Sequence, residues 1–75
     1  MSEKNRDEVA IRFGQYIKAA RLSLDMTQEV AARRLEISQS TLQRFENGLR
    51  GVELPMAIKI CRLYGLDLNE FADSL

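Results

Sequence analysis

The sequence predicts an all-α protein in which five helices form one domain. Only one proline and four glycines interrupt the chain, and β-branched residues do not cluster into runs. The apolar residues instead recur every three or four positions, which is the period of a helix. A length of 75 residues leaves room for one domain and no more. We expect a flexible N-terminal arm at residues 1–8 and a folded domain at residues 9–75.

The first helix is expected from about Asp7 to Leu24. Its apolar residues are spaced by four, three and four positions, which places them on one face. They are Phe13, Ile17, Ala20 and Leu24. Asp25 and Met26 then interrupt the helical pattern.

A short second helix is expected from Gln28 to about Leu35, with Thr27 as its N-cap. A threonine side chain at this position accepts a hydrogen bond from a free amide of the first turn. Glu29 adds a negative charge there, which the helix dipole favours. The residues that face inward are Ala31, Ala32 and Leu35.

The third helix follows a turn at Glu36–Ile37, and Ser38 is its expected N-cap. Leu42 and Phe45 lie on its inner face. The helix is expected to end at Asn47–Gly48, because both residue types tolerate the left-handed conformation that often follows a helix.

A loop over residues 49–54 precedes the fourth helix, where Pro55 fits the first turn because its missing N–H costs nothing. The apolar stripe of this helix comprises Ala57, Ile60, Cys61 and Tyr64. Gly65 ends it. Residues 67–70 resemble a capping box with Asp67 as the cap, and they open a short fifth helix whose Phe71 points inward.

The residue types present argue against several kinds of chemistry. Cys61 is the only cysteine and there is no histidine, so neither an internal disulfide nor a structural zinc site is expected. Cys61 lies on an apolar stripe with no base beside it in the sequence, which favours a core thiol over a nucleophile. A glycine-rich phosphate loop is also missing. We therefore expect neither an enzyme nor a cofactor or metal.

Net charge is zero, but the charges are unevenly distributed along the chain. Seven basic and four acidic residues lie from Arg12 to Arg50, a net charge of +3, whereas the chain from Glu53 onward carries −2. The excess of basic residues thus coincides with the second and third helices, although chance can produce such an imbalance. The N-terminus mixes charges of both signs, and no apolar run approaches the roughly 18 residues of a membrane span. A cytoplasmic protein is expected.

Two short helices joined by a turn, the second with a polar outer face, are typical of a helix-turn-helix. Here this unit spans residues 28–47. In such units the second helix enters the major groove of DNA. The residues that face outward are Gln39, Ser40, Gln43 and Arg44.

The chain from Phe13 to Phe71 resembles the lambda-repressor-like, or Xre-type (Cro/C1), family of bacterial and phage transcriptional regulators. The residues that carry this resemblance are Gly14, Ile17, Arg21, Thr27–Gln28, Ala32, Leu35, Ile37–Leu42, Phe45–Gly48, Ile60, Gly65–Leu66 and Phe71. The resemblance implies a five-helix DNA-binding domain whose partner is double-stranded DNA.

The resemblance also implies a role for individual residues. The base-facing positions are Gln39, Ser40, Gln43 and Arg44. Gln28 matches a position that binds phosphate, and Asn47 and Arg50 match positions where the following loop meets the DNA backbone. Thr41 is expected to reach either a base or a phosphate. By side-chain chemistry, Arg44 suits guanine, and Gln39 or Gln43 suits adenine.

Other positions are implied to be structural or depart from the family pattern. Arg21 and Glu46 match a pair that forms a salt bridge between the first and third helices. Glu36 stands where glycine is usual, so the turn either takes a left-handed residue at about 1 kcal/mol or adopts another shape. Ala31 replaces the usual leucine, and the loop before Pro55 is about one residue longer than in the phage repressors.

The resemblance and the small size together imply a homodimer on a two-fold operator, because half-sites about one helical turn apart need two reading helices. The predicted interface is the fifth helix and the adjacent loop, at Leu68, Phe71 and Leu75, because the core of one domain is too small to bury these residues and Ala72 together. Two alternatives stay open. One is an antitoxin-type autoregulator with a toxin protein as a second partner, and the other is a protein–protein adaptor without DNA affinity, which the zero net charge favours.

Overall fold

The computed structural model describes residues 6–75, and all of the regular structure in this part of the chain is α-helical. The helices are α1 (Arg6–Ser23), α2 (Gln28–Leu35), α3 (Gln39–Glu46), α4 (Leu54–Tyr64) and α5 (Leu68–Asp73). The predicted all-α class with five helices is therefore confirmed. Residues 6–8, which the sequence placed in an N-terminal arm, belong to α1, and residues 1–5 of that arm lie outside the described residues.

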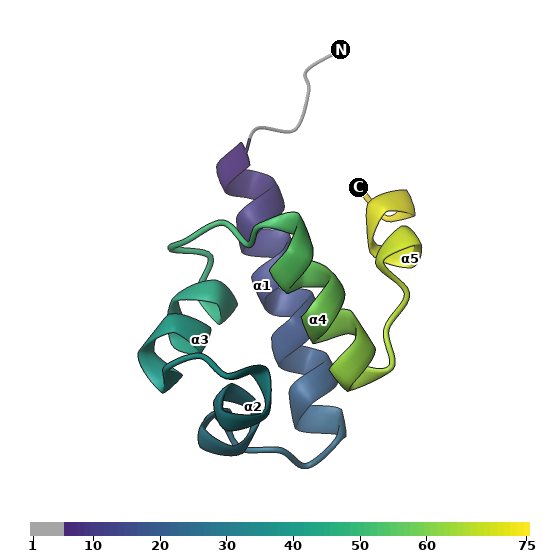
Figure 1. Cartoon of the computed structure of the whole chain (residues 1–75). Coiled ribbons are helices and arrows are strands. Elements are labelled where there is room, and N and C mark those ends of the chain that lie inside the picture. The colour runs from purple at the N-terminus through teal and green to yellow at the C-terminus, as the bar shows by residue number, and fades with distance from the viewer. Residues whose placement is uncertain (1–5) are drawn as a thin grey trace.

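The longest helix, α1, runs through the molecule, and the other helices surround it (Figure 1). Both α3 and α4 pack against α1, while α2 bridges α3 and α4. A Cβ atom added at Gly14 would collide with the backbone carbonyl oxygens of Phe45 and Glu46. Glycine at this position therefore allows α1 and α3 to approach each other closely.

The core receives side chains from all five helices. Phe71 of α5 joins it through its ring, whose centroid lies 5.0 Å from that of Phe13 and 5.3 Å from that of Tyr16. The fully buried large side chains are Ile17, Leu35, Leu42 and Ile60. The predicted inner faces of α2, α3 and α4 are confirmed, since every residue assigned to them is buried.

The prediction assigned one residue to the core wrongly. Leu24 was placed on the buried stripe of the first helix, but it is 48% exposed. The helix ends at Ser23, and Asp25 takes a left-handed conformation with φ of 56°. The chain therefore turns away before the helical period can bring Leu24 against the core.

The three predicted N-caps are confirmed by their hydrogen bonds. Thr27 Oγ1 accepts from the amide of Val30 at 3.1 Å, and Ser38 Oγ accepts from the amide of Thr41 at 3.0 Å. At the start of α5, Asp67 Oδ1 accepts from the amide of Asn69 at 2.9 Å. This last bond differs from a capping box, in which the cap would accept from the residue at position 70.

The turn between α2 and α3 is left-handed at Glu36, with φ 60° and ψ 39°. Of the two predicted alternatives, the chain thus takes a left-handed residue here and not a turn of another shape. Lys59 of α4 supports this turn. Its Nζ donates to the carbonyl oxygen of Leu35 at 2.7 Å and lies 3.7 Å from a carboxylate oxygen of Glu36. After α3, Gly48 takes the left-handed conformation (φ 71°) and Asn47 remains right-handed.

Candidate nucleic-acid interface

The helix predicted to read DNA, α3, has one face in the core and the other in solvent. Leu42 and Phe45 anchor its inner face and are buried. It lies at the side of the molecule, away from α5 (Figure 1). The predicted base-facing side chains are all exposed, namely Gln39, Ser40, Gln43 and Arg44.

The residues predicted to touch the DNA backbone lie at both ends of α3. Thr41 is half-buried, and its Oγ1 accepts from the Ser38 hydroxyl at 2.8 Å. Asn47 and Arg50 are exposed just after the helix. The guanidinium carbon of Arg50 lies 5.7 Å from the centroid of the Phe45 ring, a distance at which the cation and the ring attract each other.

Gln28 begins α2 and is half-buried. Its Nε2 donates to Glu46 Oε1, the two atoms being 2.9 Å apart. The sequence did not reveal this contact, because 18 positions separate the two residues. One signal was available: Glu46 follows Leu42 by four positions, so the helical period places it on the inner face of α3.

Arg21 and Glu46 form the salt bridge that was predicted between α1 and α3. Arg21 Nε lies 2.7 Å from Glu46 Oε2, and Nη2 lies 3.0 Å from Oε1. The two side chains are 7% and 1% exposed. A third bond runs from Arg21 Nη1 to the carbonyl oxygen of Met26 at 2.7 Å. The hydrogen bond to Glu46 raises the pKa of Arg21 above its ordinary value, although burial opposes this.

Tyr64 of α4 is electrostatically coupled to this buried pair. Burial, helped by the Glu46 carboxylate and opposed by the Arg21 cation, raises the pKa of Tyr64 to about 12. The hydroxyl oxygen of Tyr64 is itself buried and has no hydrogen-bond partner among the described residues. The phenol thus stays neutral in the folded protein across the physiological range.

Cys61 belongs to the core, as predicted, and is 4% exposed. Burial raises the pKa of this thiol, and the negative charge of Asp67 acts in the same direction. Because the thiolate is the reactive form of cysteine, this environment disfavours nucleophilic chemistry. Among residues 6–75, no group of three or more His, Cys, Asp or Glu residues is arranged to hold a metal ion.

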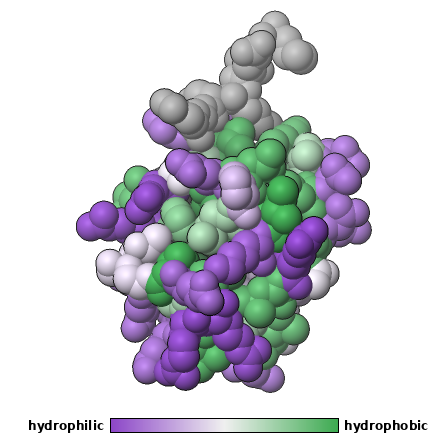
Figure 2. All heavy atoms as spheres, in the orientation of Figure 1, coloured by the Kyte–Doolittle hydropathy of each residue, from purple (hydrophilic) through white to green (hydrophobic). Residues whose placement is uncertain are grey.

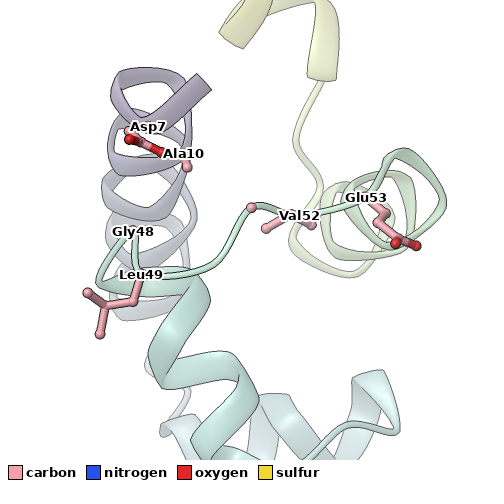
Figure 3. A pocket seen from close by; sticks show the side chains of 7 residues that line it. Asp7, Ala10, Gly48, Leu49, Val52 and Glu53 are labelled. Atoms are coloured by element: carbon pink, nitrogen blue, oxygen red, sulfur yellow. The ribbon is translucent and has the colours of Figure 1, made fainter. Parts of the chain in front are cut away.

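A hollow of about 460 Å³ lies between the start of α1 and the loop that joins α3 to α4. Figure 3 shows Asp7 and Ala10 on α1, and Leu49 pointing away from Val52 and Glu53. The lining also includes Gly48 and Gly51, and contains no cysteine, serine or lysine. Asp7 and Glu53 each contribute a carboxylate to this lining.

A comparison with models of protein families matches residues 17–71 to the helix-turn-helix family of the Cro/C1 type. The chain belongs to this family. The match spans α2 and α3, the turn between them, and α4 up to Phe71 of α5. A comparison with curated proteins found no match.

Members of the Cro/C1-type helix-turn-helix family are DNA-binding regulators rather than enzymes. In this member α2 and α3 form the helix-turn-helix, and the resemblance predicted from the sequence is confirmed. None of the helices in the described part of the chain has the length and apolar character needed to cross a membrane.

Proposed function

We propose that this protein is a sequence-specific transcriptional regulator that reads the major groove with α3 and binds a two-fold operator as a homodimer. The observation that carries this proposal is the division of α3 into a buried and a polar, exposed face. A helix seated in this way presents its outer side chains to base edges without unfolding. In this proposal the protein is of bacterial or phage origin and acts on DNA in the cytoplasm.

In this proposal the contacts divide into base readout and backbone positioning. Arg44 forms a bidentate pair with guanine, while Gln39 or Gln43 pairs with adenine. Ser40 completes the base-facing set. The residues assigned to phosphates are Gln28, Thr41, Asn47 and Arg50. Thr41 Oγ1 accepts from the Ser38 hydroxyl, which leaves the O–H of Thr41 to donate to a phosphate oxygen.

An apolar surface near α5 supports the homodimer. Leu68 and Phe71 line a hollow of about 220 Å³ together with Phe13, Val52, Leu54 and Ala57. Within this lining Phe71 is buried and Leu54 is 63% exposed. Leu75, four residues after Phe71, is 39% exposed. Figure 2 shows hydrophobic side chains gathered on this face, in the region where Figure 1 places the start of α4.

The deciding experiment is selection of preferred sites from random duplex DNA. We expect a two-fold symmetric motif with half-sites about one helical turn apart. Arg44→Ala should relax the preference at one base position of each half-site, whereas Gln28→Ala should weaken binding to all sequences alike. Arg62→Ala, an exposed arginine on α4, is the control and should keep the wild-type motif. If Arg44→Ala also kept that motif, α3 would not be the reading helix as assigned.

A titration with salt separates the regulator from the adaptor that the zero net charge favours. Binding to duplex DNA that neutralises phosphates weakens steeply as salt concentration rises. The wild-type protein should show such a slope. An adaptor should show almost no binding even at low salt, and this result would overturn the proposed function.

A further inference from the structure

The carboxylate of Glu46 joins three segments of the chain at one buried point. It accepts hydrogen bonds from Arg21 at the end of α1 and from Gln28 at the start of α2, while Glu46 itself is the last residue of α3. Arg21 also holds the α1–α2 connection through the carbonyl oxygen of Met26. The start of α2 and the end of the reading helix are therefore fixed to each other by side-chain bonds.

This arrangement determines which atom of the Gln28 carboxamide faces Glu46. An ionised carboxylate only accepts hydrogen bonds, so the amide must present its nitrogen, not its oxygen, to Glu46 Oε1. The nitrogen carries two hydrogens, and the 2.9 Å bond to Glu46 uses one of them. The second N–H is left as a donor at the half-buried edge of α2, and a DNA phosphate, which also only accepts, needs such a donor.

Arg21 makes this arrangement compatible with DNA. An uncompensated carboxylate near the phosphate backbone would repel it, and burying one is costly. Here the bidentate contact with Arg21 neutralises Glu46, and the side chain of Glu46 is 1% exposed. Glu46 can thus hold the Gln28 amide without presenting its own charge to DNA.

We propose that Glu46 is a positioning residue for DNA binding: it holds the Gln28 carboxamide with its free N–H available to a phosphate and ties this contact to the reading helix. The inference rests on the proposed DNA-binding function and extends it to a residue that does not touch DNA. It implies that Glu46 affects DNA affinity through Gln28, beyond its part in the salt bridge with Arg21.

The test is a double-mutant cycle with Glu46→Gln and Gln28→Ala, measured as affinity for a labelled duplex of random sequence, since a phosphate contact does not depend on sequence. Glu46→Gln should weaken binding by about 10-fold in the wild-type background and by less than about 2-fold when Gln28 is already alanine. A purely structural role predicts the same loss in both backgrounds. Equal losses would overturn the proposal while leaving the DNA-binding function intact.

Two controls keep the cycle decisive. Glu70→Gln, which removes a carboxylate from the exposed side of α5, should have the same effect with and without Gln28. Failure of the wild-type protein to bind the duplex at any salt concentration would overturn both the proposed function and this inference.

If Glu46→Gln does not fold, the wild-type protein alone provides the test by NMR of the Gln28 side-chain amide. In the free protein, one Nε2 proton should exchange slowly with solvent because it is bonded to Glu46, and the other should exchange fast. Addition of the random-sequence duplex should slow the second proton as well. Fast exchange of both protons in the free protein, or no slowing on DNA, would overturn the proposal.

Discussion

At the scale of single residues, Tyr64 gives the clearest prediction of how the stability of the fold depends on pH. Burial raises the pKa of its phenol to about 12, whereas an unfolded tyrosine titrates near 10. The unfolded chain therefore loses this proton at lower pH than the folded protein, so the free energy of unfolding should fall as pH rises from about 10 to about 12. Urea unfolding of the wild type and of Tyr64→Phe across this range measures the effect, and the variant should lose less stability.

The same substitution has a second expected result at neutral pH. The Tyr64 hydroxyl is buried without a hydrogen-bond partner in residues 6–75, and removing such a group relieves its desolvation cost. Tyr64→Phe should therefore unfold at the same or a higher urea concentration, with a gain of up to about 1 kcal/mol. Tyr16→Phe, at a half-buried tyrosine of α1, is the control. A clear loss of stability in Tyr64→Phe would contradict this account of the hydroxyl.

At the scale of elements, the α2–α3 turn depends on an unfavourable backbone conformation. Glu36 is left-handed, which costs a residue with a Cβ atom about 1 kcal/mol and costs glycine nothing. We expect Glu36→Gly to be more stable to urea than Glu36→Ala by about 1 kcal/mol. Both variants lack the carboxylate near Lys59, so their difference isolates the backbone. Equal stability of the two variants would mean that the turn relaxes to another conformation.

The boundaries of the helices could be predicted because the signals that set them are local. Thr27 and Ser38 each bond to an amide three positions ahead, and the spacing of Leu42 and Phe45 is enough to assign the buried face of α3. Leu24 was misplaced because the helical period says nothing about where the helix stops. The stop depends on Asp25 taking a left-handed conformation, for which aspartate has only a modest preference.

The candidate site could be predicted only in part. The exposed face of α3 follows from periodicity and a cap, and the Arg21–Glu46 pair followed from the family resemblance. The bonds from Gln28 to Glu46 and from Lys59 to Leu35 join residues 18 and 24 positions apart. Such contacts depend on how the helices pack against one another, which no local pattern in a single sequence specifies.

At the scale of the whole molecule, the two ends of the domain have different surfaces. The chain from Arg12 to Arg50, which includes α2 and α3, carries a net charge of +3, whereas the chain from Glu53 onward carries −2 and an apolar hollow lined by Leu54, Leu68 and Phe71. In the proposed function this acidic end faces away from DNA, and the hollow receives a protein surface. We assign this hollow to a second copy of the chain, because the proposed function requires a dimer.

This assignment predicts that Leu68→Glu separates the two copies. A carboxylate at the hollow would have to be desolvated in the interface, a cost that the apolar contact cannot offset. Sedimentation should show the wild type at twice the chain mass of 8.6 kDa and the variant at the chain mass itself. Affinity for a duplex with two half-sites should fall by about 10-fold or more, because the second contact is no longer intramolecular, while affinity for a single half-site should not change.

Leu22→Glu is the matched control, since Leu22 is an exposed leucine of α1 that does not line the hollow. This variant should keep the mass and the two-site affinity of the wild type. Circular dichroism should show that Leu68→Glu keeps the helix content of the wild type. Leu75→Glu repeats the test at a residue that is 39% exposed, where the fold depends less on the leucine side chain. If both variants kept the dimer mass, the dimer contact would not lie at α5. A dimer of either variant would bury two carboxylates, one from each copy, and an apolar interface does not tolerate them.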